Sequence, residues 1–151
     1  MKKYLKPLFI VYGLIMLWLL FGQRLHSIDF TDYAGRLSRN INLVPFRTVK
    51  LFIRLAKYST DSASLALAVR NLAGNIVLFI PLGFLPAIFP QLKSFVRFII
   101  TVSLCIAAVE ILQFVTLLGS CDIDDLILNV SGAVIGFVLM GLFEKSFAEK
   151  I

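Results

Sequence analysis

The stretch CDIDDLILNVSGAVIGF, residues 121–137, decides the fold. It opens with three carboxylates, Asp122, Asp124 and Asp125, and then runs without a charge into a long apolar segment. Polar and small residues recur here at spacings of three and four: Asp122, Asp125, Asn129, Gly132 and Gly136. In a helix, residues at these spacings share one face. Lipid cannot satisfy such groups, so this face predicts a packing partner within the protein.

The composition places the chain in a membrane. Of its 151 residues 59% are apolar, the mean hydropathy is +0.90, and the 16% that are charged are too few to solvate a soluble surface of this size. The formal net charge is +6, but the basic residues flank hydrophobic spans, which indicates contact with lipid phosphate and argues against nucleic acid. The length fits one domain of residues 1–151.

Four apolar segments predict an all-α bundle with transmembrane helices over residues 7–23, 71–92, 98–118 and 126–143. The first could also be a signal peptide, because lysines precede it. Its apolar run is too long for one and does not end in small residues, so an uncleaved helix is favoured. Pro81, Gly83 and Pro86 interrupt the second segment, which the interior of a bundle tolerates.

A further helix, amphipathic and about three turns long, is predicted over residues 47–58 in the first loop. Its basic residues are Arg47, Lys50, Arg54 and Lys57, and much of the opposite side is apolar: Val49, Phe52, Ile53 and Ala56. Such a helix most simply lies in the membrane interface. Two interpretations stay open, an in-plane anchor whose bases meet lipid phosphates and a platform for an anionic ligand. Asp61 marks the start of another helix.

Charge predicts the orientation. Lysines before the first span hold the N-terminus in the cytoplasm, and four spans return the C-terminus to the same side. Lys93 and Arg97 then lie inside, as the positive-inside rule requires. The first loop breaks the rule with eight basic residues against three aspartates, although its length weakens the rule and an odd number of spans would remove the conflict.

The alternation of spans brings polar residues to one side of the membrane, the outer one in this orientation. We expect a binding site formed by Arg47, Asn71, Asn75, Glu110, Gln113, Asp122, Asp124, Asp125 and Asn129. Glu110 is a candidate for a functional site by default. It lies about 12 Å from the end of its span, and an ionisable group at that depth in the membrane costs free energy.

The carboxylates leave two kinds of role open. Glu110, Asp122 and Asp125 are candidates for acid–base catalysis or for holding a divalent cation such as Mg²⁺; no other cofactor is expected. A structural role is the alternative, with Glu110 protonated or paired with Arg47 or Arg70, Asp124 solvated and Asp125 capping the fourth helix. Zinc is improbable, because Cys105, Cys121 and His26 lack ligand spacing.

Four sequence blocks, in order, resemble the VanZ-like family of small bacterial membrane proteins over about two thirds of the chain. They are NLVPF (residues 42–46), NIVLFIPLGFLP (75–86), the Glu110/Gln113 pair and DIDDLILN (122–129). The resemblance implies a multi-span protein of the bacterial cytoplasmic membrane and a link to low-level resistance against teicoplanin, a glycopeptide antibiotic. Members commonly carry an arginine where this chain has Gly119, which puts full equivalence of the site in doubt.

Three functions follow as expectations. The first is an envelope-modifying or antibiotic-shielding protein whose outward polar pocket binds an anionic lipid or a lipid-linked cell-wall intermediate. The second is a membrane transferase or hydrolase acting on a lipid head group or polyprenyl phosphate, with Glu110 or Asp125 as acid or base. The third is a small proton-coupled transporter, for which 151 residues would require a homo-oligomer. A plain scaffold also remains open.

Overall fold

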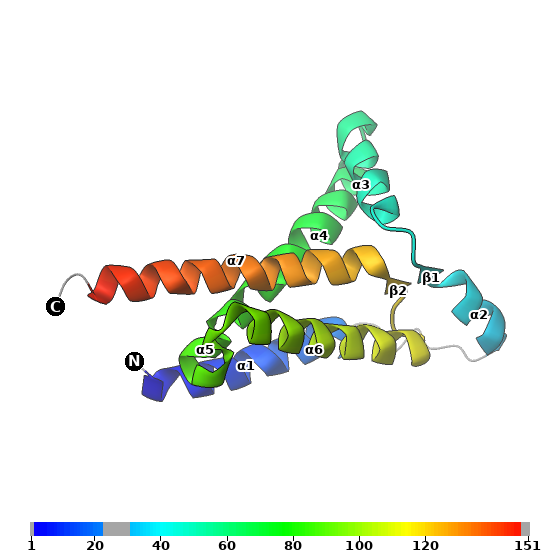
Figure 1. Ribbon diagram of the computed structural model, residues 1–151. Helices are drawn as coiled ribbons and strands as arrows, with labels where there is room; N and C mark the ends of the chain where they lie inside the picture. The colour runs from blue at the N-terminus through cyan, green and yellow to red at the C-terminus, as the bar shows by residue number, and fades with distance from the viewer. Residues whose placement is uncertain (1, 23–30, 149–151) are drawn as a thin grey trace.

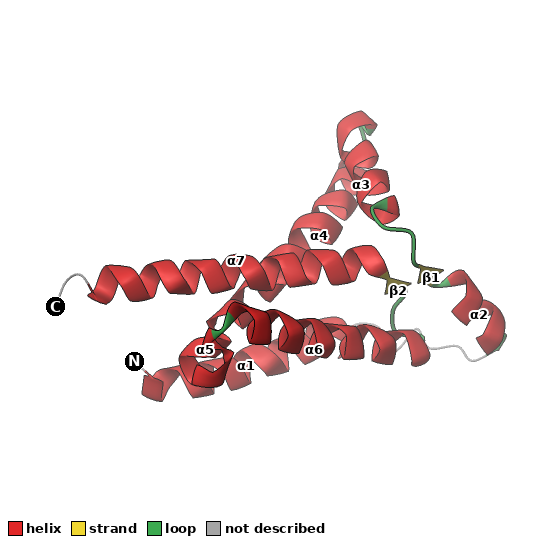
Figure 2. Ribbon diagram, in the orientation of Figure 1, coloured by secondary structure: helices red, strands yellow, loops and turns green. Residues whose placement is uncertain are grey.

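The computed structural model describes residues 2–22 and 31–148. Its helices, in chain order, are α1 (Lys2–Leu20), α2 (Tyr33–Arg39), α3 (Arg47–Tyr58), α4 (Ser62–Phe79), the 3₁₀ turn η2 (Ile80–Phe84), α5 (Leu85–Ile88), the 3₁₀ turn η3 (Pro90–Lys93), α6 (Phe95–Val115) and α7 (Ile123–Ala148). Two short strands, β1 (Ile41–Asn42) and β2 (Cys121–Asp122), are the only other regular structure in this part of the chain (Figure 2). The all-α prediction is confirmed.

Three of the helical segments are long and apolar enough to cross a membrane: 62–88, 95–115 and 123–146. Helix α1 adds a shorter apolar segment, Tyr4–Leu20; the last residue of the first predicted span, Gln23, lies outside the described residues. Helices α1, α6 and α7 run along one direction, the two termini lie at one end, and β1 and β2 lie at the other (Figure 1).

The second membrane segment begins at Ser62, nine residues before the expected start at Asn71. Asp61 caps it, because its carboxylate accepts the N–H groups of Ala63 and Ser64. The helix is continuous as far as Phe79, where Pro81 lacks the N–H that an α-helix needs and the chain tightens into η2. The Tyr12 hydroxyl of α1 donates to the Leu78 carbonyl at 2.8 Å, which satisfies backbone polarity at this break.

Small residues let α7 approach α4 and η2 closely. A Cβ added at Gly132 would overlap the Ile76 carbonyl, and one added at Gly136 would overlap that of Ile80. Gly83 on η2 packs directly against the backbone of Gly136. Membrane helices use such contacts because lipid tails compete equally well for larger apolar side chains. The seam predicted from the spacing in residues 122–137 therefore packs as a helix interface.

Helix α3 is the predicted amphipathic helix. It follows β1, packs beside α4 and is steeply inclined to α7 (Figure 1). If α7 crosses the membrane, this direction places α3 close to the membrane plane. The basic residues Arg47, Lys50, Arg54 and Lys57 are exposed.

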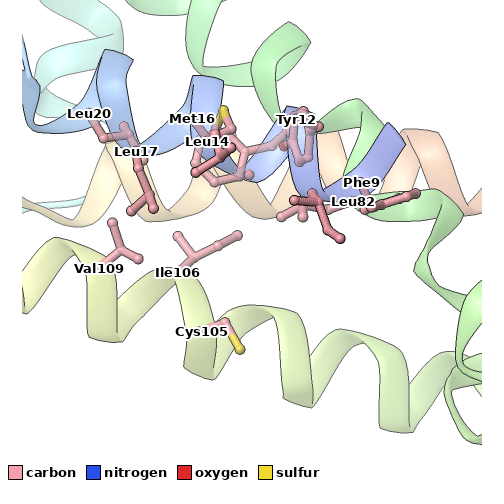
Figure 3. Close-up of a pocket in the computed structure, with 13 residues that line it drawn as sticks. Phe9, Tyr12, Leu14, Met16, Leu17, Leu20, Leu82, Cys105, Ile106 and Val109 are labelled. Atoms are coloured by element: carbon pink, nitrogen blue, oxygen red, sulfur yellow. The ribbon is translucent and has the colours of Figure 1, made fainter. Parts of the chain in front are cut away.

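The core lies between α1, α4, α6 and α7, where the buried residues are Met16, Phe79, Phe98, Val102, Ile106 and Ala133. A cavity of about 450 Å³, lined by apolar side chains, separates α1 from α6 (Figure 3). Leu17 of α1 faces Ile106 and Val109 of α6 across this cavity. It carries almost no polar surface, so the polar candidate site lies elsewhere.

Candidate functional site

The acidic residues of β2 and α7 bind the segment that leads into α3. Strand β2 pairs in parallel with β1, with Ile41 opposite Cys121 and Asn42 opposite Asp122. The Asp122 carboxylate accepts the Thr48 hydroxyl at 2.6 Å and the Asn42 amide at 3.1 Å. It also accepts the Asp124 N–H at 2.9 Å, so Asp122 caps α7. The NLVPF and DIDD segments therefore dock on one another.

Asp124 caps α3 from a different helix. Its side chain is 0% exposed and accepts the backbone N–H groups of Phe46, Thr48 and Val49. These are donors that a helix start leaves unsatisfied, and no side chain of α3 caps them, because Phe46 holds the cap position with a φ of 62°. The structural alternative that left Asp124 solvated is wrong, since burial with three donors keeps it out of water.

Asp125 contacts the second membrane segment. The Asn75 amide donates to its carboxylate at 2.6 Å, which joins α4 to α7 at the depth where both helices approach. Because α7 starts at Ile123, Asp125 lies in its first turn and does not cap it, contrary to the structural alternative. Asn71, one turn before Asn75, donates instead to the Leu67 carbonyl of its own helix at 2.9 Å.

Glu110 and Gln113 join α6 to two different helices. The Asn129 amide of α7 donates to the Glu110 carboxyl at 3.2 Å. Gln113 is buried and donates to the Leu20 carbonyl at the end of α1, at 2.9 Å. The expected polar residues thus form four separate contacts between helices, all toward the end of the bundle that carries β1 and β2.

Arg47 lies apart from these contacts, on a polar hollow of about 270 Å³. The residues that line it are Arg39, Asn40, Ile41, Asn42, Arg47, Thr48, Leu51 and Ser120. Arg39 is paired with Asp32 at 2.9 Å, which offsets its charge. Arg47 is exposed and forms no ion pair with another described residue. An unpaired guanidinium beside hydroxyl and amide groups can bind an anion.

Five polar residues of this hollow were missed by the sequence-based set: Arg39, Asn40, Asn42, Thr48 and Ser120. Asn42 belongs to the NLVPF segment, so the family resemblance pointed to its neighbourhood. Thr48 and Ser120 carry no spacing signal. They reach the hollow only because β1 pairs with β2, which brings residues about 80 positions apart in the chain side by side.

The Cys121 thiol, which lies next to these acidic residues, has a shifted pKa. Burial raises the pKa of this thiol above its ordinary value, and negative charge at Glu110 and Asp122 adds to the increase. Within the described part of the chain, no three His, Cys, Asp or Glu side chains come together as a metal-binding group. Catalytic roles for Glu110, Asp122 and Asp125, and a bound divalent cation, remain predictions.

Together these features define a multi-pass, all-α membrane protein whose helix ends are joined by buried polar contacts. The chain belongs to the VanZ/LLP1 family, whose model matches residues 9–144. It is similar to Protein VanZ from Enterococcus faecium, with 28% identity over 147 residues, which covers 96% of this chain and 78% of that protein. No solved structure matches the chain.

Proposed function

We propose that this protein lowers bacterial susceptibility to teicoplanin-type glycopeptides by binding an anionic lipid or a lipid-linked cell-wall intermediate at the Arg47 hollow. Membership of the VanZ/LLP1 family supports the link to resistance. The observation that carries the binding step is the exposed Arg47 beside a polar hollow of about 270 Å³. Its charge is available for a ligand, because the described carboxylates nearby bind backbone and hydroxyl groups instead.

The chemistry of the hollow suits a phosphate. Arginine presents several N–H donors in a planar fork that matches phosphate oxygens, and the Ser120 hydroxyl adds a neutral donor. The Thr48 hydroxyl and the Asn42 amide line the same hollow, but both donate to Asp122. The backbone N–H groups at the start of α3 are occupied by Asp124, so they do not compete for the ligand. Binding then depends on Arg47.

The placement suits a lipid head group. The exposed bases of α3 extend along the same helix as Arg47, and basic residues near a membrane surface attract anionic lipids by about 1 kcal/mol each. With the N-terminus in the cytoplasm of a bacterial cell, the end of the bundle that carries β1 and β2 faces outward. The ligand would therefore come from the outer leaflet of the cytoplasmic membrane.

Two matched variants test this proposal. Arg47→Gln and Lys57→Gln each remove one exposed positive charge from α3, so both lose the same general attraction to an anionic surface. Purified proteins are titrated with vesicles containing phosphatidylglycerol, and cells producing each variant are exposed to teicoplanin. We expect Arg47→Gln to lose more affinity than Lys57→Gln, and to lose the resistance that Lys57→Gln keeps.

Gly119→Arg provides a gain-of-affinity arm. Gly119 precedes Ser120 of the hollow, and no described glycine has a positive φ, so an arginine fits its backbone. It should strengthen vesicle binding in the wild-type background. Equal losses for Arg47→Gln and Lys57→Gln in both assays would contradict the proposal. They would mean that Arg47 contributes only a general positive charge, as Lys57 does, and no specific binding.

A further inference from the structure

The apolar cavity between α1 and α6 shares no lining residue with the Arg47 hollow. It measures about 450 Å³ and is not enclosed. Its floor belongs to the core, since Met16, Phe79 and Ile106 line it and are buried. Its rim includes Leu14 and Leu17 of α1, which are exposed (Figure 3). The cavity is therefore packed on its inner side and open on the outer surface of the bundle.

The lining of this cavity offers almost nothing to a polar ligand. No charged side chain lines it, and its oxygen-bearing side chain, Tyr12, already donates to the Leu78 carbonyl at 2.8 Å. The Cys105 thiol is a weak donor at best. Cavities with such walls stay free of water and accept apolar molecules.

Both walls of the cavity lie at membrane depth. The wall from α1 belongs to the apolar segment Tyr4–Leu20, and the wall from α6 belongs to residues 95–115, a segment long and apolar enough to cross a membrane. The hydrocarbon chains of lipids surround such segments. A gap left empty here would deprive its walls of dispersion contacts, so a chain that enters from the bilayer is stabilised by the contacts it restores.

The size of the cavity favours a lipid chain over a second protein helix. A helix about 10 Å across fills roughly 420 Å³ in each turn, so a second copy of this chain could place only about one turn there. A cavity of about 450 Å³ lies within the range of roughly 300–1,000 Å³ that small apolar ligands occupy in proteins. A single flexible chain fits both limits.

We propose that this cavity binds one hydrocarbon chain of a membrane phospholipid, which lies between Leu17 of α1 and Val109 of α6. These two side chains face one another across the cavity (Figure 3). The site recognises the chain and has no group for a head group, so it is independent of the Arg47 hollow and of the ligand proposed there. The bound chain completes the packing of α1 against α6.

Photocrosslinking of the whole protein in lipid nanodiscs tests the proposal. The probe is a phosphatidylcholine that carries a diazirine in one acyl chain, and mass spectrometry locates the labelled residues. We expect Val109 to be labelled more strongly than Leu104, which lies on the same helix, is 66% exposed and does not line the cavity. Labelling that follows exposure alone, with Leu104 above Val109, would overturn the proposal.

Two glycines provide matched variants. Gly13 lines the cavity and a Cβ there meets nothing within 4 Å, so Gly13→Leu fills the space without a clash. Gly141 on α7 is equally free but lies outside the cavity, and Gly141→Leu gains the same helix propensity. We expect Gly13→Leu to lower the labelling of Val109 several-fold and Gly141→Leu to leave it unchanged.

Equal labelling of Val109 in both leucine variants would contradict the site. Cys105→Phe fills the cavity from the opposite wall and repeats the test if Gly13→Leu fails to accumulate. It should lower the labelling of Leu17 several-fold, and unchanged labelling of Leu17 would overturn the proposal in the same way.

Arg47→Gln separates this site from the Arg47 hollow. The variant should leave the labelling of Val109 unchanged, even if it loses the head-group binding proposed above. A phosphatidylglycerol with the same diazirine chain should label Val109 as strongly as the phosphatidylcholine does. A loss of labelling in Arg47→Gln, or a dependence on the head group, would contradict a site that recognises the chain alone.

Discussion

The Asp124 carboxylate accepts the backbone N–H of Thr48 at 2.8 Å, which fixes the start of α3 to the start of α7 across 76 residues of chain. The N–H groups of Val49 and Phe46 bind the same side chain. The acidic residues that sequence reasoning assigned to a ligand therefore act within the protein at this point. They hold the segment that carries Arg47 against the end of the bundle.

Asp124→Ala should destabilise the protein strongly. The change leaves three backbone N–H groups without an acceptor, and each buried donor left unpaired costs about 1–3 kcal/mol, so the total should be at least about 3 kcal/mol. Thermal unfolding in detergent, at constant lipid content, measures the effect. Asp61→Ala is the matched control, because Asp61 caps α4 in exposed surroundings where water can replace it. Equal losses for the two variants would contradict the role of Asp124.

The close approach of η2 and α7 makes Gly83 intolerant of a side chain. Gly83→Ala places a Cβ against the backbone of Gly136, which cannot move aside, so the variant should lose stability or fail to accumulate in the membrane. Gly141→Ala, on α7 itself, is the control, because nothing lies within 4 Å of a Cβ there, and alanine favours a helix by about 1 kcal/mol over glycine. If both variants accumulate equally, the packing described here is incorrect.

Asn75 and Asp125 should be coupled energetically. Their hydrogen bond of 2.6 Å joins α4 to α7 and includes a carboxylate, a kind of bond that contributes about 1.5–3 kcal/mol. A double-mutant cycle of Asn75→Ala and Asp125→Ala, read by unfolding in detergent, should give a coupling energy of at least about 1 kcal/mol. The pair of Asn71→Ala with Asp125→Ala should be additive, since Asn71 binds the Leu67 carbonyl. Additive effects of Asn75→Ala and Asp125→Ala would contradict a stabilising contribution from this hydrogen bond.

The Cys121 thiol should react slowly with alkylating reagents at neutral pH. Burial raises its pKa, so at a given pH the folded protein holds less of the reactive thiolate than an unfolded chain does. In a Cys105→Ala background, the pH at which alkylation reaches half its maximal rate should therefore lie higher in the folded protein than in the denatured one. The same pH midpoint in both states would contradict the burial of this thiol.

The helix interface of α7 was predictable because it depends on local spacing. Residues three and four apart share a face, so Asp125, Gly132 and Gly136 could be placed on one seam, and they pack against α4 and η2. Asn129 and Glu110 were both in the predicted set for a related reason, since a polar residue in an apolar helix needs a partner on another helix.

The anchoring of α3 could not be read from the sequence. Asp124 binds backbone N–H groups, and every residue except proline carries one, so no partner side chain signals the contact. The pairing of β1 with β2 spans only two residues on each strand, too few for a strand pattern. The hollow forms only where the β1–β2 pairing and the Asp124 contact bring these segments together. For this reason Thr48 and Ser120 could not be predicted as its lining residues.

Hydrogen–deuterium exchange of the Asp124→Asn variant tests the central claim most directly, namely that Asp124 anchors α3. Asparagine keeps the volume but removes the charge and one acceptor oxygen, so the amides of residues 46–49 should exchange faster than in wild type. Residues 129–136 of α7 should keep their protection, because their packing does not involve Asp124. Unchanged protection at residues 46–49, in a variant that folds, would contradict the claim.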